Sequence, residues 1–359
     1  LLLISSYVVY LIYPYYTTPI VNQIDFVQWW QQFILTHHDG GHYLLMAQFG
    51  YNIPTIGVKA LAFLPLFPFL IFLTNNLINN YYLSAIFLNI IFSTLSIFLL
   101  YKIVKKEFDY KVAYLTVFLF LIFPTTFFIL MPYTESLFIL LSLAAFYLLE
   151  KNKIGWAAVL GILLSLTRLL GLVICIPIFL HIVENYKLTK KSLYLLALVP
   201  LLGTLGYLGL NWMIGGYPLA FLTHQTHERW ENSPQFIWDT FVILPFAAIN
   251  TYNIGFEFVA ARWGSLLIFL IVSFLTLIYG TLKKINLKYL LYCLVFIVIT
   301  FSVSNPQSGM RFLMALWPLM MIQAVFFIKH KWLLILYVPL CIGLAILAWL
   351  FFVAGRATV

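Results

Sequence analysis

The sequence predicts an all-α polytopic membrane protein, and three observations support this fold class. Of its 359 residues, 64% are hydrophobic and 9% are charged, whereas globular chains are roughly half apolar and about a quarter charged. Apolar runs close to the ~20 residues that span a bilayer recur along the chain. All lysines but one lie in short segments between these runs. The composition excludes a soluble single-domain enzyme and a disordered chain.

The apolar runs define the expected helices. The first run, 1–13, is short and is interpreted as a transmembrane helix cut at its start, not as a signal peptide. The run 59–74 contains prolines and is expected to be interfacial or re-entrant. The run 156–183 has 28 residues, which predicts two short helices that return to one side, with their apex at Thr167-Arg168. The other candidate spans are 81–101, 112–131, 136–149, 193–213, 263–282, 289–303, 312–328 and 332–353.

Lysine predicts the orientation of these helices. Fourteen of the 15 lysines lie in the segments 102–111, 151–153, 187–191, 283–288 and 329–331, which the positive-inside rule places in the cytoplasm. The count is then about 11 transmembrane helices, with the N-terminus inside and the C-terminus outside. Two long extracytoplasmic loops remain, 14–80 and 214–262. The formal charge of +9 is therefore mainly a topology signal, and no nucleic-acid partner is expected.

Arginine follows a different pattern, because none of the five lies in a predicted cytoplasmic segment. They are Arg168, Arg229, Arg262, Arg311 and Arg356. The planar guanidinium suits phosphate and carboxylate, so the pattern favours an anion site on the outer side. For Arg229, Arg262 and Arg356, the alternative is an ordinary interfacial residue.

The densest polar cluster is 37–43, which follows a predicted amphipathic helix at 26–37. Its two glycines are expected to break the helix and leave Asp39 at a helix end among histidines. A carboxylate placed there can act as a general base, or it can cap a turn. His37 and His42 are weak candidates for a metal site.

Three further outer positions combine charge with apolar surroundings. Glu135 follows Tyr133 between two predicted spans, where ionisable residues are costly and usually functional; the alternative is a helix-cap device. Arg168 needs a carboxylate partner, such as Glu135 or Asp39, or a ligand phosphate. Gln307 and Arg311 precede a span and favour an anion site at a helix N-terminus, or a tight turn with a snorkelling arginine.

The second long outer segment contains the spacing HxxHE at 224–228. His224 and His227 are weak metal candidates, because HExxH places its glutamate between the two histidines. A solvated or substrate-lining loop is the favoured interpretation. The sequence indicates no cofactor, although a divalent metal stays possible.

Several of these motifs together resemble a known family. They are HHDGGHYLLMAQFGY, AFLPLFP, FPTTFFILMPYTESLFILLSLAAFY, LLSLTRLLG and SGMRFLMALWP, in this order between about residues 37 and 320. The set resembles the PIG-V family, GPI mannosyltransferase 2 and its prokaryotic relatives, within the GT-C glycosyltransferases. His38 occupies the position where this family usually has tryptophan.

The resemblance implies a GT-C fold and an inverting sugar transfer from a polyprenyl-phosphate donor, with mannose the expected sugar. It implies Asp39 as the general base and donor or substrate contacts from a further set of residues: His38, His42, Tyr43, Tyr133, Glu135, Arg168, Gln307 and Arg311. Arg168 and Arg311 would bind the leaving phosphate, while Tyr133 and Glu135 would orient sugar hydroxyls or fix Arg168. The acceptor stays open between a glycan, a lipid and a protein.

The expected organisation has three parts. Residues 1–213 form the GT-C-like transmembrane module, 214–262 the second long outer loop, and 263–359 the C-terminal helices. The site would face the outside of the plasma membrane in a prokaryote, or the lumen of the endoplasmic reticulum in a eukaryote, in contact with membrane lipids. The alternatives are the same chemistry with another sugar, or a transporter or flippase of a lipid-linked sugar.

Overall fold

A computed structural model describes residues 25–53, 57–186, 191–226, 233–250, 259–306 and 308–354. Within these residues the secondary structure is helical, apart from one isolated β-bridge between Pro234 and Val303. The principal helices are α2 (Phe26–Trp29), α3 (Asp39–Phe49), α4 (Leu66–Ile78), α5 (Tyr81–Glu107), α6 (Tyr110–Leu121), α7 (Glu135–Glu150), α8 (Ile154–Thr167), α9 (Cys175–Tyr186), α10 (Leu201–Gly215), α11 (Ala220–Thr226), α12 (Ile237–Asn250), α14 (Ser265–Leu282), α15 (Leu287–Phe301), α16 (Gly309–Ala315), α17 (Trp317–Lys329) and α18 (Lys331–Val353).

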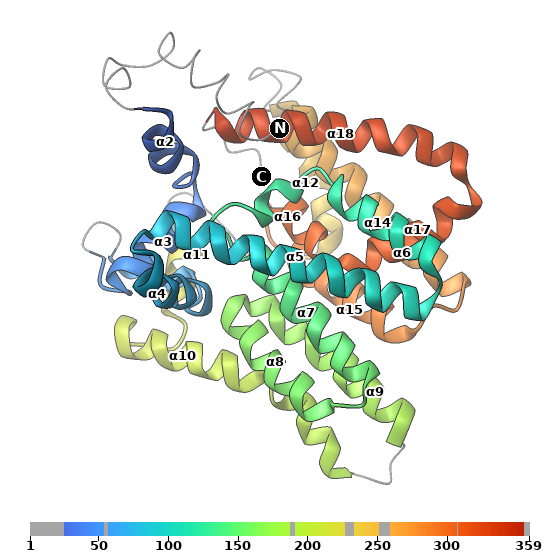
Figure 1. Cartoon of the computed structure of the whole chain (residues 1–359), viewed down its shortest axis with the longest axis horizontal. Coiled ribbons are helices and arrows are strands. Elements are labelled where there is room, and N and C mark those ends of the chain that lie inside the picture. The colour runs from blue at the N-terminus through green and yellow to red at the C-terminus, as the bar shows by residue number, and fades with distance from the viewer. Residues whose placement is uncertain are drawn as a thin grey trace.

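Helix α7 lies at the centre of the bundle. It packs against α5 and α8, while α6 packs against both α5 and α17. Figure 1 shows α5 and α7 crossing the middle of the molecule and α18 running along one side of it. All residues of α7 from Glu135 to Ile139 are buried, so the first turn of this helix reaches the interior.

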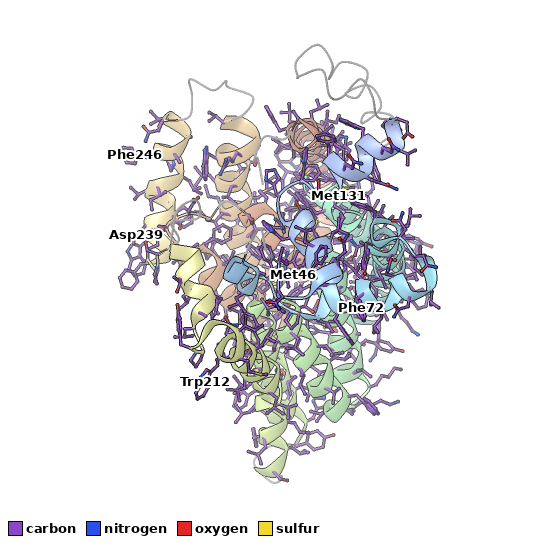
Figure 2. All side chains as sticks on the ribbon, turned by 90° about the vertical axis from the view of Figure 1, so that its left-hand side faces the viewer. Met46, Phe72, Met131, Trp212, Asp239 and Phe246 are labelled. Atoms are coloured by element: carbon purple, nitrogen blue, oxygen red, sulfur yellow. The ribbon has the colours of Figure 1, made fainter. Side chains whose placement is uncertain are left out.

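Four helical segments of the described chain are long and apolar enough to cross a membrane, and two bent helix pairs raise this number to six. The four are Tyr81–Glu107, Leu169–Tyr186, Arg262–Leu282 and Lys331–Val353. The expected total of about 11 transmembrane helices is not tested by these lengths. Large apolar side chains cover the outside of the molecule, among them Trp212 and Phe246, which are 65% and 61% exposed (Figure 2). A surface of this kind suits lipid better than water.

The expected break at Arg168 is confirmed. Helix α8 ends at Thr167, Arg168 is extended, and a 3-10 turn η6 (Leu169–Ile174) leads into α9. The expected spans at 193–213 and 312–328 are bent. The first consists of the 3-10 segment η8 (Lys191–Leu198) and α10 at 42° to one another, and the second of α16 and α17 at 72°.

One expected span is shorter than predicted. The apolar run 112–131 does not continue as one helix, because α6 ends at Leu121. Pro124 lacks a main-chain N–H donor, which disfavours helix continuation. The chain then turns through η5 (Thr126–Ile129), and the Thr126 hydroxyl donates to the carbonyl oxygen of Phe120 at 2.6 Å. The hydropathy of this run therefore correctly predicted a mostly buried segment, but it did not predict that the helix ends at Leu121.

Candidate functional site

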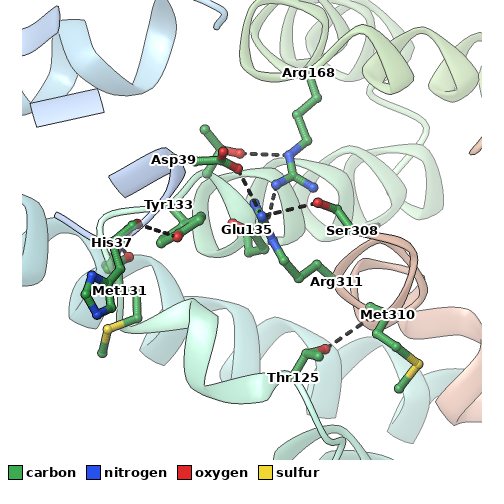
Figure 3. Close-up of polar contacts among 12 residues, drawn as sticks. His37, Asp39, Thr125, Met131, Tyr133, Glu135, Arg168, Ser308, Met310 and Arg311 are labelled. Carbon is green, nitrogen blue, oxygen red and sulfur yellow. Dashed lines mark hydrogen bonds and ion pairs between the residues drawn. The ribbon is translucent and has the colours of Figure 1, made fainter. Parts of the chain in front are cut away.

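Four segments that lie far apart in the sequence bring their charged side chains together. Asp39 stands in the first turn of α3 and Glu135 in the first turn of α7. Arg168 follows the last residue of α8, and Arg311 lies in α16. Figure 3 shows the four side chains pointing toward one another from these elements. The expectation that Arg168 finds a carboxylate partner is confirmed, and the partner is Glu135.

Glu135 is the centre of this ion network. Its side chain is fully buried, and Oε1 accepts from Arg168 Nη2 at 2.5 Å and from Arg311 Nε at 2.8 Å. Arg168 also donates from Nε to the hydroxyl of Thr134 at 2.7 Å. Thr134 is the N-cap residue of α7 and Glu135 stands in its first turn, as the helix-cap interpretation expects, but the Thr134 side chain makes no cap bond to the helix. Its hydroxyl accepts from Arg168 and so belongs to the ion network.

Arg311 connects the buried carboxylate to Asp39. Its Nη1 donates to Asp39 Oδ2 at 2.9 Å and approaches Ser308 Oγ at 3.5 Å. The guanidinium carbon lies 4.5 Å from the ring centroid of Tyr133 and 4.8 Å from that of Phe128. Both aromatic rings attract a cation, and together they restrict the position of the guanidinium group. The arrangement therefore fixes where the Asp39 carboxylate can lie.

Asp39 is the accessible member of the network. Its side chain is 29% exposed, against 5% for Arg311 and none for Glu135. Burial alone would raise the pKa of Asp39, but the Arg311 guanidinium, through its charge and its hydrogen bond, holds that pKa below its ordinary value. The carboxylate is thus ionised at neutral pH, which is the form that can accept a proton.

The histidines around Asp39 are held in the neutral form. Burial and the neighbouring charge of His38 lower the pKa of His37 to about 4, although contact with the main chain of Val353 opposes this shift. Burial also lowers the pKa of His38 and of His42, in both cases against the charge of Asp39. At neutral pH these imidazoles can accept or donate a hydrogen bond without carrying charge.

The local chain path at Asp39 differs from the expectation. Gly40 and Gly41 do not break a helix, because both lie within α3, and the break is at His38, with φ 49° and ψ −125°. The glycines are required by close approach instead. A Cβ on Gly40 would stand 2.5 Å from the carbonyl oxygen of Leu35, and one on Gly41 would stand 2.7 Å from that of Thr36. These contacts seat the start of α3 on the preceding turn.

Two predicted substrate contacts are buried inside the protein. Tyr133 is 1% exposed, and its hydroxyl donates to the carbonyl oxygen of His37 at 2.7 Å. Tyr43 is 6% exposed and packs its ring against Phe63 and Phe67. His42, in the same helix as Asp39, is half-buried with its ring 4.8 Å from that of Phe63. His38, next to Asp39, keeps part of its surface exposed, while its ring lies near that of Phe352 and is partly desolvated there.

Other predicted positions lie outside the described residues. These are Gln307, His227, Arg229, Arg356 and the side chain of His224. In the part of the chain that is described, no group of three or more His, Cys, Asp or Glu side chains could hold a metal ion. The sequence candidates for a metal site therefore gain no support from the described residues.

Sequence reasoning missed several residues that build the site. Thr134 and Ser308 contact the two arginines, and Phe312 lies under the Arg168 guanidinium, 5.0 Å from ring centroid to carbon. Asn89 in α5 accepts from Ser136 at 2.6 Å and also donates to the carbonyl oxygen of Met131. An asparagine inside a 27-residue apolar helix was the one available signal, because a polar amide in such a helix needs a partner.

The comparisons with known proteins point to one superfamily. Residues 61–208 match the model of the dolichyl-phosphate-mannose-protein mannosyltransferase family. The match contains Tyr133, Glu135 and Arg168 but ends before Arg311 and begins after Asp39. No curated protein matches the chain.

The oligosaccharyltransferase of Archaeoglobus fulgidus is a similar solved structure. In its complex with zinc and sulfate it superposes with a TM-score of 0.52 and 14% identity, over 98% of this chain and 53% of that one. The superposition on its apo form covers 99% of this chain and 55% of that one, with 14% identity and a TM-score of 0.48. The chain thus spans about half the length of the archaeal protein.

The fold is therefore the all-α membrane fold of the GT-C glycosyltransferases. The match to the mannosyltransferase family model is limited to residues 61–208. The finer resemblance to the PIG-V family rests on the sequence motifs alone.

Proposed function

We propose that this chain is a GT-C glycosyltransferase that moves a sugar from a polyprenyl-phosphate donor to an acceptor hydroxyl, with Asp39 as the general base. Mannose is the sugar that the PIG-V resemblance favours, and the matched family is of the same kind. The observation that carries the proposal is the position of Asp39. It is the partly exposed end of an otherwise buried ion network in a helical membrane fold.

The proposed reaction inverts the anomeric carbon. The acceptor oxygen attacks this carbon from the face opposite the phosphate, and its proton passes to Asp39. The bond between the anomeric carbon and the phosphate oxygen breaks, and the lipid phosphate leaves with the electron pair. General-base assistance of this kind contributes roughly 100- to 10,000-fold in rate.

Arg311 orients the base in this proposal. Its Nη1 holds one oxygen of Asp39 at 2.9 Å, and the other oxygen is left to face the acceptor. The same ion pair makes Asp39 a weaker base, because it stabilises the charged form. Proton transfer therefore accompanies or follows formation of the new C–O bond, when the acceptor oxygen has become acidic.

Arg168 is the group that we assign to the leaving phosphate or to a sugar hydroxyl next to it. Within the described residues, Arg168 Nη1 is buried and has no hydrogen-bond partner. A buried donor without an acceptor costs free energy, and an oxygen of the bound donor substrate would satisfy it. Glu135 contacts both arginines, so it would set their geometry and not contact the acceptor.

The outer side of the membrane is the proposed location of the site. Helix α7 begins at Glu135 and ends next to Lys151, while α8 begins after Lys153 and ends before Arg168. The charged network thus lies at the helix ends opposite the lysines, which favour the cytoplasm. This direction supports a plasma-membrane outer face in a prokaryote, or a lumenal face in the endoplasmic reticulum of a eukaryote.

The substitution Asp39→Asn tests the proposal, with Asp25→Asn as the matched control. Asp25 precedes α2 in the same segment and only caps that helix, accepting from the Gln28 main-chain N–H at 2.8 Å. Purified protein would receive polyprenyl-phosphate-mannose and a panel of glycan, lipid and peptide acceptors. Asp39→Asn should lower turnover at least about 100-fold while donor binding persists. Equal turnover in the Asp39→Asn variant and the wild-type protein would refute the base assignment.

A transporter or flippase of a lipid-linked sugar is the second candidate. The 72° bend between α16 and α17, next to Arg311, is the observation that favours it, because transporters often bind substrates at broken helices. Reconstitution in vesicles separates the two functions. Transfer of labelled sugar to an acceptor supports the enzyme, whereas movement of the intact labelled lipid across the bilayer without transfer supports the transporter.

A further inference from the structure

The turn before Asp39 has a main-chain conformation that histidine rarely adopts. His38 has φ 49° and ψ −125°, a region in which glycine is at ease and other residues are strained. Such strain costs about 1–3 kcal/mol and persists only where the surroundings hold the residue in place. Because Asp39 follows directly, whatever holds His38 also sets the direction of the Asp39 side chain.

The last turn of α18 supplies much of this support. The ring of Phe352 stands edge-on to His37, with centroids 5.6 Å apart, and 6.1 Å from the ring of His38. It also lies edge-on to Phe128 at 5.3 Å and to Tyr133 at 6.4 Å. Phe352 is 1% exposed. One side chain therefore contacts both histidines of the turn and both aromatic rings that flank Arg311.

The first half of α18, residues 331–340, has no buried side chain, although Tyr337 packs against Phe269 and Phe327. Only 22% of its most apolar window is buried, and Ile346 and Leu350 are 55% and 41% exposed. Its buried residues gather toward its end, with Trp349, Phe352 and Val353 among them. Figure 1 shows α18 along one side of the molecule. The buried positions Cys341, Leu344, Ala348 and Phe352 follow one face of α18. The contact of Phe352 with the His37–His38 turn lies at the end of this buried face.

We propose that Phe352 is a positioning residue for Asp39, acting through the His37–His38 turn. The hydrogen bond from the Tyr133 hydroxyl to the carbonyl oxygen of His37 holds the turn from one side, and the Phe352 ring packs on both imidazoles from α18. Truncation of Phe352 would let the strained turn relax and move the carboxylate. A displacement of about 1 Å can lower a rate about 100-fold. This inference rests on the proposed role of Asp39 as the base.

The kinetic test compares Phe352→Ala, Phe352→Leu and Leu350→Ala in purified protein with polyprenyl-phosphate-mannose. Phe352→Ala should lower kcat about 10- to 100-fold, with the donor KM within about twofold of wild type. Phe352→Leu keeps apolar volume and should recover part of the loss. Leu350→Ala lies on the exposed face of the same turn and should leave turnover unchanged. A fall in donor affinity with kcat intact would overturn the positioning role.

A second readout needs no turnover. Diethylpyrocarbonate modifies neutral imidazoles, and mass spectrometry gives the rate at His37 and at His38. His37 is half-buried beside Phe352, so Phe352→Ala should raise its modification rate several-fold, while Leu350→Ala should not. The modification rate at His181 reports whether a variant is folded, because a folded variant should show the wild-type rate there. If Phe352→Ala does not fold, Phe352→Leu takes its place in the comparison with Leu350→Ala.

The two readouts separate failure of this inference from failure of the proposed function. Turnover that survives Asp39→Asn would refute the proposed function, whatever Phe352 does. If Asp39→Asn is inactive but Phe352→Ala behaves as Leu350→Ala in rate and in labelling, the positioning role is wrong. Faster labelling of His37 with unchanged turnover would also overturn it, because Asp39 would then not depend on this turn.

Discussion

Replacement of Glu135 by leucine should destabilise the protein more than any other single change at the site. Glu135 is fully buried, and one of its oxygens accepts from both Arg168, at 2.5 Å, and Arg311, at 2.8 Å. Leucine would leave Arg168 buried without a counter-ion and Arg311 with Asp39 alone. Loss of one partner from a buried ion pair costs about 3–5 kcal/mol, because the remaining charge stays desolvated.

The pair between Lys288 and Glu184, whose carboxylate side chain is exposed, provides the control. It has a distance of 3.4 Å, with the Glu184 side chain 40% exposed, and such surface pairs contribute about 0–1 kcal/mol. Unfolding free energies would be measured by denaturant titration in mixed detergent micelles, followed by tryptophan fluorescence. Glu135→Leu should lose about 3–5 kcal/mol and Glu184→Leu less than about 1 kcal/mol.

A double variant tests the reason for the loss. Combining Glu135→Leu with Arg168→Met removes one buried negative and one buried positive charge and leaves the pair of Arg311 with Asp39. Replacing a buried pair by apolar groups of similar volume is often neutral or stabilising. The double variant should therefore be more stable than Glu135→Leu alone. The reasoning fails if Glu135→Leu costs no more than the surface control, or if the second substitution adds to the loss.

Two further changes probe the segment around Asp39. Gly40→Ala should cost about 1–3 kcal/mol of unfolding free energy, because the new Cβ would meet a main-chain oxygen at 2.5 Å. Gly206→Ala, in an open helical position with nothing within 4 Å, should gain up to about 1 kcal/mol; equal effects would refute the role of close approach. The pKa of His37 is lowered to about 4 in the folded protein, from 6.5 in the unfolded chain. Because the unfolded chain therefore binds a proton more readily, stability falls as the pH drops from 6.5 toward 4. Wild type should therefore lose at most about 2 kcal/mol between pH 7 and pH 5 from this group, and His37→Gln should lose less in the same denaturant titration. An unchanged acid sensitivity of the variant would show that His37 is not the cause.

Much of the helical framework could be predicted from local chemistry. The break at Arg168 was visible because the 28-residue apolar run is long for one spanning helix and short for two, and because lysines flank both of its ends. The start of α7 near Glu135 followed from the polar residues that separate two apolar runs. Composition and the positions of the lysines, however, do not indicate where a spanning helix bends. The 72° angle between α16 and α17 was therefore not predicted.

The geometry of the site could be predicted only in part, because its decisive contacts are long-range. Arg311 and Asp39 are separated by 272 positions, and no periodicity or spacing connects them. Gly40 and Gly41 were interpreted as helix breakers from their conformational freedom, whereas their real requirement is the absence of a Cβ next to main-chain oxygens. Conformational freedom can be inferred from residue type, but proximity to another segment cannot.

The ion network also explains how four charges are tolerated among apolar helices. Asp39 and Glu135 carry two negative charges, Arg168 and Arg311 two positive ones, so the set is neutral as a whole. Neutrality lowers the desolvation cost that isolated charges would meet. It also has a chemical consequence. If Asp39 accepts a proton, as the proposed mechanism requires, the network would become positive by one charge at the moment when a lipid phosphate would leave with its negative charge. Proton transfer and phosphate release would then stabilise one another through the same two arginines.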